Sequence, residues 1–156
     1  MDERNAEIHE RVGRALEEVE RQGERLAVLC VQVEPESGGE PEAVREQVSL
    51  RLTPRLRATD AVLVGGADRL LVLLPGVESV GDAATVARKI MGLLAEPFDL
   101  GGREVHVEGR VGLALYPDHG FDPKALLRNA EGAMRRAGTD VRWHAPTAPA
   151  ADDLAS

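Results

Sequence analysis

The chain has 156 residues, a net charge of −8 and 43% hydrophobic residues, and only 3% of its residues are aromatic. This length predicts one domain with a substantial core, built mainly from aliphatic side chains. The acidic balance excludes a general nucleic-acid or anionic-membrane binder, which needs a basic surface. No apolar run is long enough to span a membrane and the charged first residues lack a signal-peptide core, so we expect a cytoplasmic protein of bacterial type.

The first third of the chain predicts a helix followed by a buried strand. Four aliphatic residues recur at helical spacing near the N-terminus: Ile8, Val12, Leu16 and Val19. This stripe predicts that residues 1–24 form an amphipathic helix that packs on the domain or leads into it. The run Leu26–Val33 is almost entirely apolar, which is typical of a central strand covered on both faces. The single cysteine, Cys30, lies in this run and is expected to be buried.

A turn-rich loop, a second helix and a hairpin follow. Residues Glu34–Pro41 contain two glycines and two prolines and are expected to form the loop. The spacing of Val44, Val48 and Leu52 predicts a helix that ends or kinks at Pro54. Two apolar runs then flank Gly65-Gly66-Ala67-Asp68, a pattern that predicts a β-hairpin with these four residues as its turn.

The next segment predicts one helix and two strands. Apolar residues repeat on one face between Asp82 and Leu94, which indicates a third helix. Residues Leu100–Arg103 contain a Gly-Gly pair and are expected to form a turn between two strands. The second of these strands is expected to run from Val105 to Tyr116 and to end at Pro117.

A fourth helix and a short strand complete the predicted domain. Asp122 followed by Pro123 is a strong helix start, because a carboxylate caps the first free N–H groups and proline suits the first helical position. The helix is expected to end near Gly138 and to bury four residues: Leu126, Leu127, Ala130 and Met134. Residues 141–144 could form a last strand, and residues 146–156 are expected to form a flexible Ala/Pro/Asp tail.

This order of elements predicts an α/β (α+β) fold, in which a mixed sheet made of hairpins and helical crossovers is covered by helices. We expect residues 25–145 to form the domain. Four blocks within residues 10–143 are informative together: the strand Leu26–Glu34, the hairpin after Arg57-Ala58-Thr59-Asp60, the strand Val111–Pro117 and the helix Leu126–Met134. In this order they resemble the GGDEF family, the bacterial diguanylate cyclases. The resemblance implies a palm-like sheet related to nucleotide cyclases and polymerases.

The hairpin carries the family signature in altered form. With Asp60 and the strand Leu70–Pro75 as anchors, the five signature positions fall without a gap on Gly66, Ala67, Asp68, Arg69 and Leu70. The literal Gly65-Gly66 pair would fit the signature only after a shift of one residue. We therefore prefer the anchored register.

The resemblance implies that carboxylates on the first strand and in the hairpin hold Mg²⁺ for phosphoryl transfer. Gln32 stands at the position on the first strand, where an amide supplies no negative charge. Asp68 matches one acidic position of the hairpin, but Arg69 stands at the next one and would repel a cation. Glu34 and Asp68 could form only a weak substitute pair. We therefore expect no metal and no other cofactor.

The substrate segment also departs from the family pattern. The loop after the first strand is short and lacks the lysine and asparagine that the resemblance implies for binding GTP. The lysine that usually follows the last helix is replaced by Gly138 or deleted. These losses predict a catalytically inactive domain. The alternative is a weakly active diguanylate cyclase that converts two GTP to cyclic di-GMP with Mg²⁺.

The resemblance also implies a product site at Arg57 and Asp60, which have the family's Arg-x-x-Asp spacing before the signature. A forked guanidinium can bind a guanine edge or a phosphate, and the carboxylate can accept guanine N–H groups. Arg88 or Lys89 would add a second basic group. Alternatively, Arg57 and Asp60 form a simple ion pair at the start of a strand. Two binding roles thus stay open: a cyclic di-GMP receptor, or a module for a protein partner or homodimer.

Overall fold

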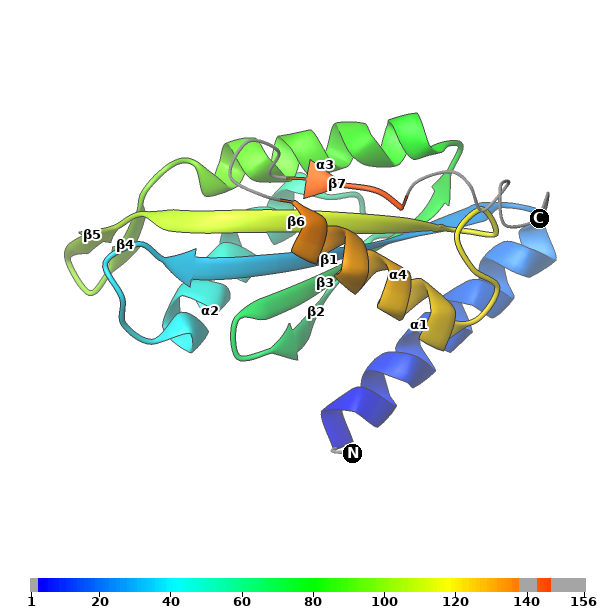
Figure 1. Ribbon diagram of the computed structural model, residues 1–156, viewed down its shortest axis with the longest axis horizontal. Coiled ribbons are helices and arrows are strands. Elements are labelled where there is room, and N and C mark those ends of the chain that lie inside the picture. The colour runs from blue at the N-terminus through cyan, green and yellow to red at the C-terminus, as the bar shows by residue number, and fades with distance from the viewer. Residues whose placement is uncertain (1–2, 138–142, 147–156) are drawn as a thin grey trace.

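The computed structural model describes residues 3–137 and 143–146 (Figure 1). The helices are α1 (Glu3–Gln22), α2 (Pro41–Leu52), α3 (Val80–Leu94) and α4 (Pro123–Arg136), with a 3₁₀ turn, η1 (Thr53–Arg55). The strands are β1 (Arg25–Pro35), β2 (Ala61–Gly66), β3 (Arg69–Val77), β4 (Phe98–Leu100), β5 (Arg103–Val105), β6 (Val107–Tyr116) and β7 (Trp143–His144). The predicted element types occur in the predicted order, except that three strands rather than two lie between α3 and α4.

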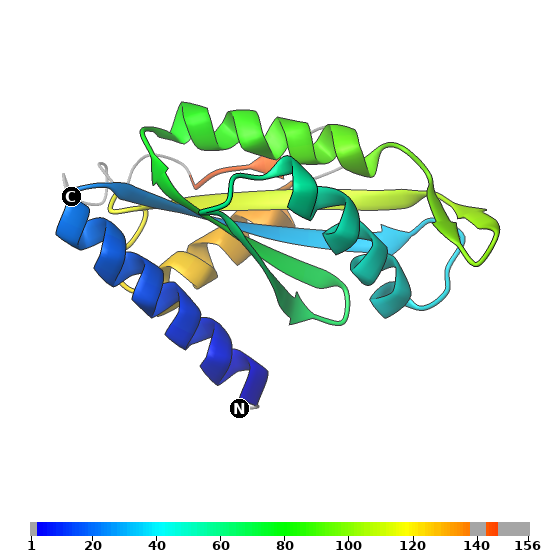
Figure 2. The same ribbon diagram turned by 180° about the vertical axis from the view of Figure 1, so that it is seen from behind.

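Five strands form one mixed sheet in the order β2-β3-β1-β6-β7. Strand β1 is central and pairs antiparallel with β3 and β6, whereas β7 runs parallel to β6 at the sheet edge. Helices α1 and α4 cover one face, and Figure 2 shows α2 and α3 on the other. The prediction of a mixed sheet covered by helices is therefore confirmed.

Strand β1 separates two hydrophobic cores because successive side chains of a strand point to opposite faces. Ala27, Leu29 and Val31 belong to the core under α2 and α3. Leu26, Val28 and Cys30 belong to the core under α1 and α4, which also contains the four aliphatic residues of the α1 stripe. The continuous apolar run predicted a strand buried on both faces. These six side chains are all buried, which confirms the prediction.

The helix signals are confirmed with small differences in length. The Asp122 side chain accepts a hydrogen bond from the Ala125 N–H at 2.8 Å, and Pro123 is the first helical residue of α4. Helix α2 ends at Leu52, where η1 continues through Pro54. Helix α4 ends at Arg136, and its predicted end near Gly138 lies outside the described residues. Among the described residues, no helix is long and apolar enough to cross a membrane.

Outside the signature hairpin, two predictions differ from the structure. The predicted strand from Val105 to Tyr116 is interrupted at His106, because β5 folds back on β4 as a separate two-stranded sheet before β6 joins the main sheet. The His106 carbonyl accepts a hydrogen bond from the Glu36 N–H at 2.9 Å, in register with the neighbouring pair Pro35 and Val107 of β1 and β6. Leu127 was expected to be buried and is only partly so. Residues 141–142 and the predicted tail from 147 lie outside the described residues.

Arg51 joins α2 to the end of α3. Its guanidinium donates hydrogen bonds to the carbonyls of Leu93, Glu96 and Pro97 at 2.9, 2.7 and 2.7 Å, and lies 3.5 Å from the centre of the Phe98 ring. The Leu93 carbonyl lies in the last turn of α3, where positive charge is favoured, and Glu96 and Pro97 belong to the turn between α3 and β4. Arg51 therefore fastens two helices of the same layer.

We expect Arg51→Ala to lower the free energy of unfolding by about 2 kcal/mol, because it removes charge-assisted hydrogen bonds and a cation–π contact. Urea denaturation followed by circular dichroism measures the loss. Arg55→Ala is the matched control, since that side chain is exposed, and its effect should stay within about 0.5 kcal/mol. Equal stability of the two variants would contradict the role given to Arg51.

Candidate functional site

The signature hairpin lies beside the end of β1. Arg69 at the start of β3 pairs with Gln32 of β1, and the Val33 N–H donates to the Asp68 carbonyl at 2.9 Å. Gly65 and Gly66 belong to β2, so the turn contains only Ala67 and Asp68 and is shorter than the predicted four residues. The pairing register shifts between Val64 and Gly66, which leaves Gly65 as an extra, bulged residue.

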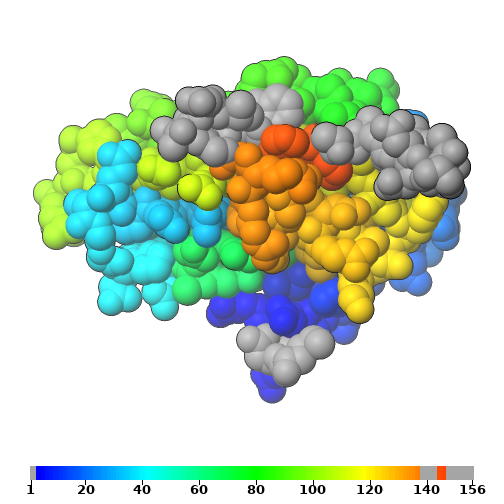
Figure 3. All heavy atoms as spheres, in the orientation of Figure 1, coloured from blue at the N-terminus to red at the C-terminus, as the bar shows by residue number. Residues whose placement is uncertain are grey.

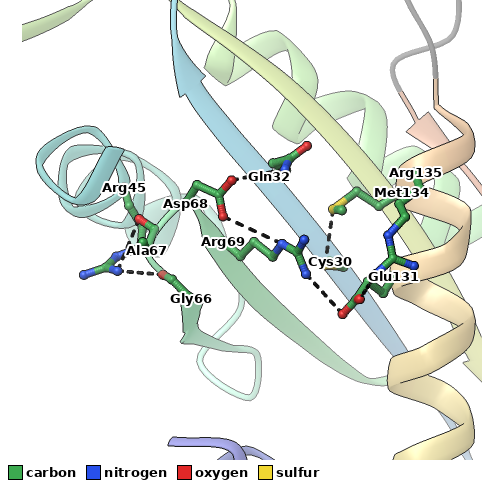
Figure 4. A network of polar contacts seen from close by, with 10 residues as sticks. All are labelled: Cys30, Gln32, Arg45, Gly66, Ala67, Asp68, Arg69, Glu131, Met134 and Arg135. Atoms are coloured by element: carbon green, nitrogen blue, oxygen red, sulfur yellow. Dashed lines mark hydrogen bonds and ion pairs between the residues drawn. The ribbon is translucent and has the colours of Figure 1, made fainter. Parts of the chain in front are cut away.

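A chain of polar contacts crosses from β1 through the hairpin to α4 (Figure 4). The Gln32 side-chain amide donates to Asp68 Oδ2 at 3.1 Å. Arg69 lies between two carboxylates: its Nε is 3.7 Å from Asp68 Oδ1, and its Nη1 is 3.2 Å from Glu131 Oε2 on α4. Arg135 also pairs with Glu131. The guanidinium of Arg69 thus holds the hairpin and α4 together.

These groups are mostly shielded from water. The side chains of Arg69, Asp68 and Glu131 are 29%, 31% and 36% exposed, and partial burial strengthens their attraction relative to a fully exposed pair. The Arg69 Nε has no hydrogen-bond acceptor among the described residues, because the Asp68 contact is an ion pair and too long for a hydrogen bond. The negative charge of Asp68 is therefore already balanced by the Arg69 guanidinium.

The other side of the hairpin is fixed by α2. Arg45 donates from Nη1 to the carbonyl of Gly66 at 2.6 Å and approaches that of Ala67 at 3.4 Å. Leu70, the last predicted signature position, has no exposed surface and belongs to the core. The structure thus gathers Gln32 and the signature residues into one site, in which backbone and side chains have partners from α2, β1 and α4.

Arg57 and Asp60 lie together between η1 and β2. The guanidinium of Arg57 contacts both oxygens of Asp60, with its shortest distance, 2.8 Å, from Nη2 to Oδ1. Asp60 Oδ2 also accepts from the Arg57 N–H at 2.8 Å, and Arg57 Nη2 donates to the Pro75 carbonyl at 2.8 Å. The side chain of Asp60 is 3% exposed, whereas that of Arg57 is 54% exposed. Asp60 therefore orients Arg57, and Arg57 presents the accessible surface.

The two basic residues expected near this pair differ in position. Lys89 donates from Nζ to the Arg55 carbonyl at 2.9 Å, so α3 brings it to the turn just before Arg57. Arg88 Nη2 donates to Thr85 Oγ1 at 3.2 Å on its own helix. Of the two, Lys89 is shown to contact the segment that carries Arg57.

A family model described as "Diguanylate cyclase, GGDEF domain" matches residues 40–143, which is more than half of the chain. The chain belongs to the GGDEF family. It is 32% identical over 140 residues to the diguanylate cyclase TpbB of Pseudomonas aeruginosa, and 30% identical over 135 residues to an uncharacterized signaling protein of Caulobacter vibrioides. These matches cover 85% and 81% of this chain but only 32% and 17% of the two relatives. This GGDEF chain therefore spans a third or less of each relative's length.

Solved GGDEF structures share the fold. The GGDEF domain of TpbB (also called YfiN) from Pseudomonas aeruginosa superposes with a TM-score of 0.80 at 29% identity, covering 97% of this chain and 94% of that one. The GGDEF domain of DgcB from Caulobacter crescentus, solved in complex with c-di-GMP, has a TM-score of 0.74 at 14% identity, covering 93% of this chain and 88% of that one. The palm-like α+β architecture that the four sequence blocks implied is thus shown.

At the positions that the resemblance assigns to metal ligands, this GGDEF domain has one carboxylate, Asp68, and the Gln32 amide and the Arg69 guanidinium are bound to it. Hard cations prefer several anionic oxygens. Among the described residues, no group of three or more His, Cys, Asp or Glu lies close enough together to hold a metal ion. The carboxylate oxygens of Asp68 are therefore in contact with two side chains of the protein itself, Gln32 and Arg69.

Sequence reasoning missed two residues of this site. Glu131 stands where the family's last helix block has an acid, so its position carried a signal, but its partner Arg69 is distant in the sequence. Arg45 lies beside the apolar stripe of α2, and nothing in the local pattern indicates that it contacts the hairpin carbonyls. Both contacts exist only because the fold brings separate elements together.

His119 gives the domain a pH-dependent stability. Its Nδ1 accepts a hydrogen bond from the Leu115 N–H at 2.9 Å, which requires a neutral ring. Burial lowers the pKa of His119, and the neighbouring Asp118 carboxylate opposes that shift. The unfolded chain therefore binds a proton at higher pH than the folded one, so the contribution of His119 is complete above its ordinary pKa of about 6.5.

We accordingly expect the free energy of unfolding to fall as the pH drops below about 6.5 toward the lowered pKa of the folded state. His119→Asn supplies a neutral acceptor at every pH and should reduce the difference between urea unfolding at pH 8 and pH 5. His106→Gln, on an exposed side chain, serves as the control and should leave that difference unchanged. A pH profile that His119→Asn does not alter would contradict this assignment.

Proposed function

We propose that this GGDEF domain is catalytically inactive and acts in cyclic di-GMP signalling by binding rather than by synthesis. The observation that carries the proposal is the position of the Arg69 guanidinium, which bridges Asp68 and Glu131 at the site where the family pattern requires metal-binding carboxylates. Two of the three positions that would face a metal, Gln32 and Arg69, supply no negative charge.

The chemistry of phosphoryl transfer explains why this change matters. The reaction depends on metal ions that activate the attacking hydroxyl and neutralise the triphosphate. A guanidinium can offset charge on a phosphate, but it cannot lower the pKa of a hydroxyl by coordinating it. Arg69 would also repel a divalent cation approaching Asp68. No metal ion would then promote deprotonation of the attacking substrate hydroxyl at this site.

The direct test is GTP turnover by the full chain with Mg²⁺ or Mn²⁺, with product separated by chromatography. The diguanylate cyclase TpbB of Pseudomonas aeruginosa serves as the positive control. We expect no cyclic di-GMP above the protein-free reaction. Product formation that is lost in Asp68→Asn would overturn the inactive assignment.

One observation favours the alternative of a weak cyclase. Glu34 and Asp68 line the same hollow, of about 250 Å³, together with the loop glycines Gly38 and Gly39. If these two carboxylates held a metal ion, Glu34→Gln should remove any residual turnover as completely as Asp68→Asn. Residual turnover that survives Glu34→Gln would exclude this substitute pair.

We assign cyclic di-GMP binding to the surface around Arg57. The Arg57 side chain is half exposed and held in place by Asp60, and Lys89 contacts the preceding turn. Both Asp60 oxygens already accept two hydrogen bonds each. We therefore give the ligand contacts to the guanidinium of Arg57 and treat Asp60 as its positioning residue.

Titration calorimetry with cyclic di-GMP should show affinity in the micromolar range or better that is lost in Arg57→Ala. Arg57→Lys should also bind weakly, because an ammonium lacks the planar fork that matches a phosphate or a guanine edge. Arg55→Ala, an exposed arginine two residues away, should bind as the parent does. Absence of heat with the intact chain would contradict the ligand assignment, whereas the turnover test addresses the inactive assignment separately.

A further inference from the structure

A small cavity lies where α1, the signature hairpin and α4 meet, and Figure 3 shows these three elements adjoining one another. Its volume is about 210 Å³. Ile8 of α1, Leu71 of β3 and Leu127 of α4 form apolar walls, and Arg69 and Glu131 form a charged end. Asn5 and His9 of α1 also line the cavity and add polar groups. The cavity therefore combines apolar walls with one charged pair and with polar side chains of α1.

The inner wall of this cavity is uncharged. Cys30 of β1 contributes to it, and its Sγ lies 3.4 Å from the Met134 sulfur. Burial raises the pKa of the Cys30 thiol to about 12, so the thiol stays neutral at physiological pH. A buried neutral thiol packs as a small hydrophobic group. A ligand in this cavity thus needs an apolar body.

The charged end offers one donor and one acceptor side by side. Arg69 Nη1 and Glu131 Oε2 are 3.2 Å apart, and the Arg69 Nε has no acceptor among the described residues. An anionic ligand would meet the Glu131 carboxylate, and a cationic ligand would meet the Arg69 guanidinium. A neutral group with a C=O beside an N–H satisfies both residues at once.

We propose that this cavity binds a small flat cyclic amide, with its C=O toward Arg69, its N–H toward Glu131 and its ring against Leu71 and Leu127. The volume is below the 300 Å³ or so at which pockets for drug-sized ligands begin, so a single ring fits best. Because Ile8 forms one wall, an occupied cavity would also add contacts between α1 and the sheet. This site is separate from the surface around Arg57 and does not depend on the proposed function.

Uracil is a suitable probe, since it is flat and carries adjacent C=O and N–H groups. We expect saturable shifts of the Leu71 and Leu127 backbone amide signals when uracil is titrated into the isotope-labelled full chain. 1,3-Dimethyluracil has the same ring but no N–H, and should bind at least about tenfold more weakly because the Glu131 carboxylate then loses its donor. Equal binding of the two compounds would overturn the proposed recognition.

Two variants test the location. Leu127→Phe should abolish uracil binding by filling the cavity, and Leu127 is only partly buried, so the larger side chain can be accommodated. Glu131→Ala should weaken uracil binding at least about tenfold while leaving the apolar walls intact. Phe121→Ala, on a side chain that is 77% exposed and does not line the cavity, is the control. No shifts up to the solubility of uracil, or shifts unchanged in folded Leu127→Phe, would refute the site.

Discussion

Gly112→Ala should lower the free energy of unfolding by at least about 3 kcal/mol, a large loss for one added methyl group. Gly112 lies on β6, directly under α4. A Cβ at this position would lie 2.1 Å from the Met134 nitrogen and 2.2 Å from the Ala130 carbonyl oxygen. Both atoms belong to the backbone of α4, so no change of rotamer relieves the contact. The helix itself has to move away from the sheet.

The displacement would reach the candidate site, because Glu131 lies on α4 between the two residues that clash. Such a shift separates Glu131 from Arg69 and also opens the core that Leu126 and Met134 fill. A typical domain is stable by only about 5–15 kcal/mol in total. We therefore expect Gly112→Ala to be either strongly destabilised or unfolded at room temperature, as measured by urea denaturation.

Gly92→Ala is the matched control for the glycine substitution. Gly92 lies within α3 and is exposed, and apart from its own chain neighbours and the nearby helix backbone no heavy atom lies within 4 Å of the place that an added methyl group would occupy. Alanine favours a helix over glycine by about 0.8–1 kcal/mol, so this variant should be more stable than the parent. If Gly112→Ala lowers the free energy of unfolding and Gly92→Ala raises it, the loss at Gly112 comes from close packing and not from replacing a glycine as such. Equal stability of Gly112→Ala and the parent would show that α4 lies farther from β6.

The order of elements could be predicted because each one carries a local signal. The Asp122-Pro123 pair marks the start of α4, and the continuous apolar run of β1 indicates a strand with a core on each face. The break at His106 had no such signal. Residues 103–116 show an almost unbroken strand pattern, and only the pairing of β5 with β4 rather than with the main sheet reveals the change of direction.

The candidate site was predictable in composition but not in geometry. The sequence placed Gln32, Asp68 and Arg69 at one site, and the pairing of Gln32 with Arg69 brings them together. It could not show that the Asp60 side chain is only 3% exposed, because burial of a carboxylate depends on the packing of the surrounding chain. Nor could it show that Glu131 is the second partner of Arg69, since that contact depends on how α4 lies across the sheet.

Arg69→Glu should make the stability of the domain depend on divalent metal ions. The substitution removes the cation between Asp68 and Glu131 and adds a third carboxylate to the same partly buried place. Mutual repulsion should raise the pKa of at least one carboxyl group and cost about 2 kcal/mol at neutral pH. A carboxyl whose pKa is raised by folding stabilises the folded state less as the pH increases. The loss should therefore be smaller at pH 5 than at pH 8.

Millimolar Mn²⁺ or Mg²⁺ should restore much of this loss, because a cation that binds only the folded state raises its stability with increasing concentration. Thermal unfolding with and without metal measures the effect in the parent, in Arg69→Glu and in Arg69→Gln. The last variant removes the guanidinium without adding charge, so it separates loss of the ion pairs from gain of a ligand. We expect a metal-induced rise in the melting temperature for Arg69→Glu alone. A similar rise in the parent would mean that Arg69 does not keep divalent cations away, and the inactive assignment would then lose its electrostatic basis.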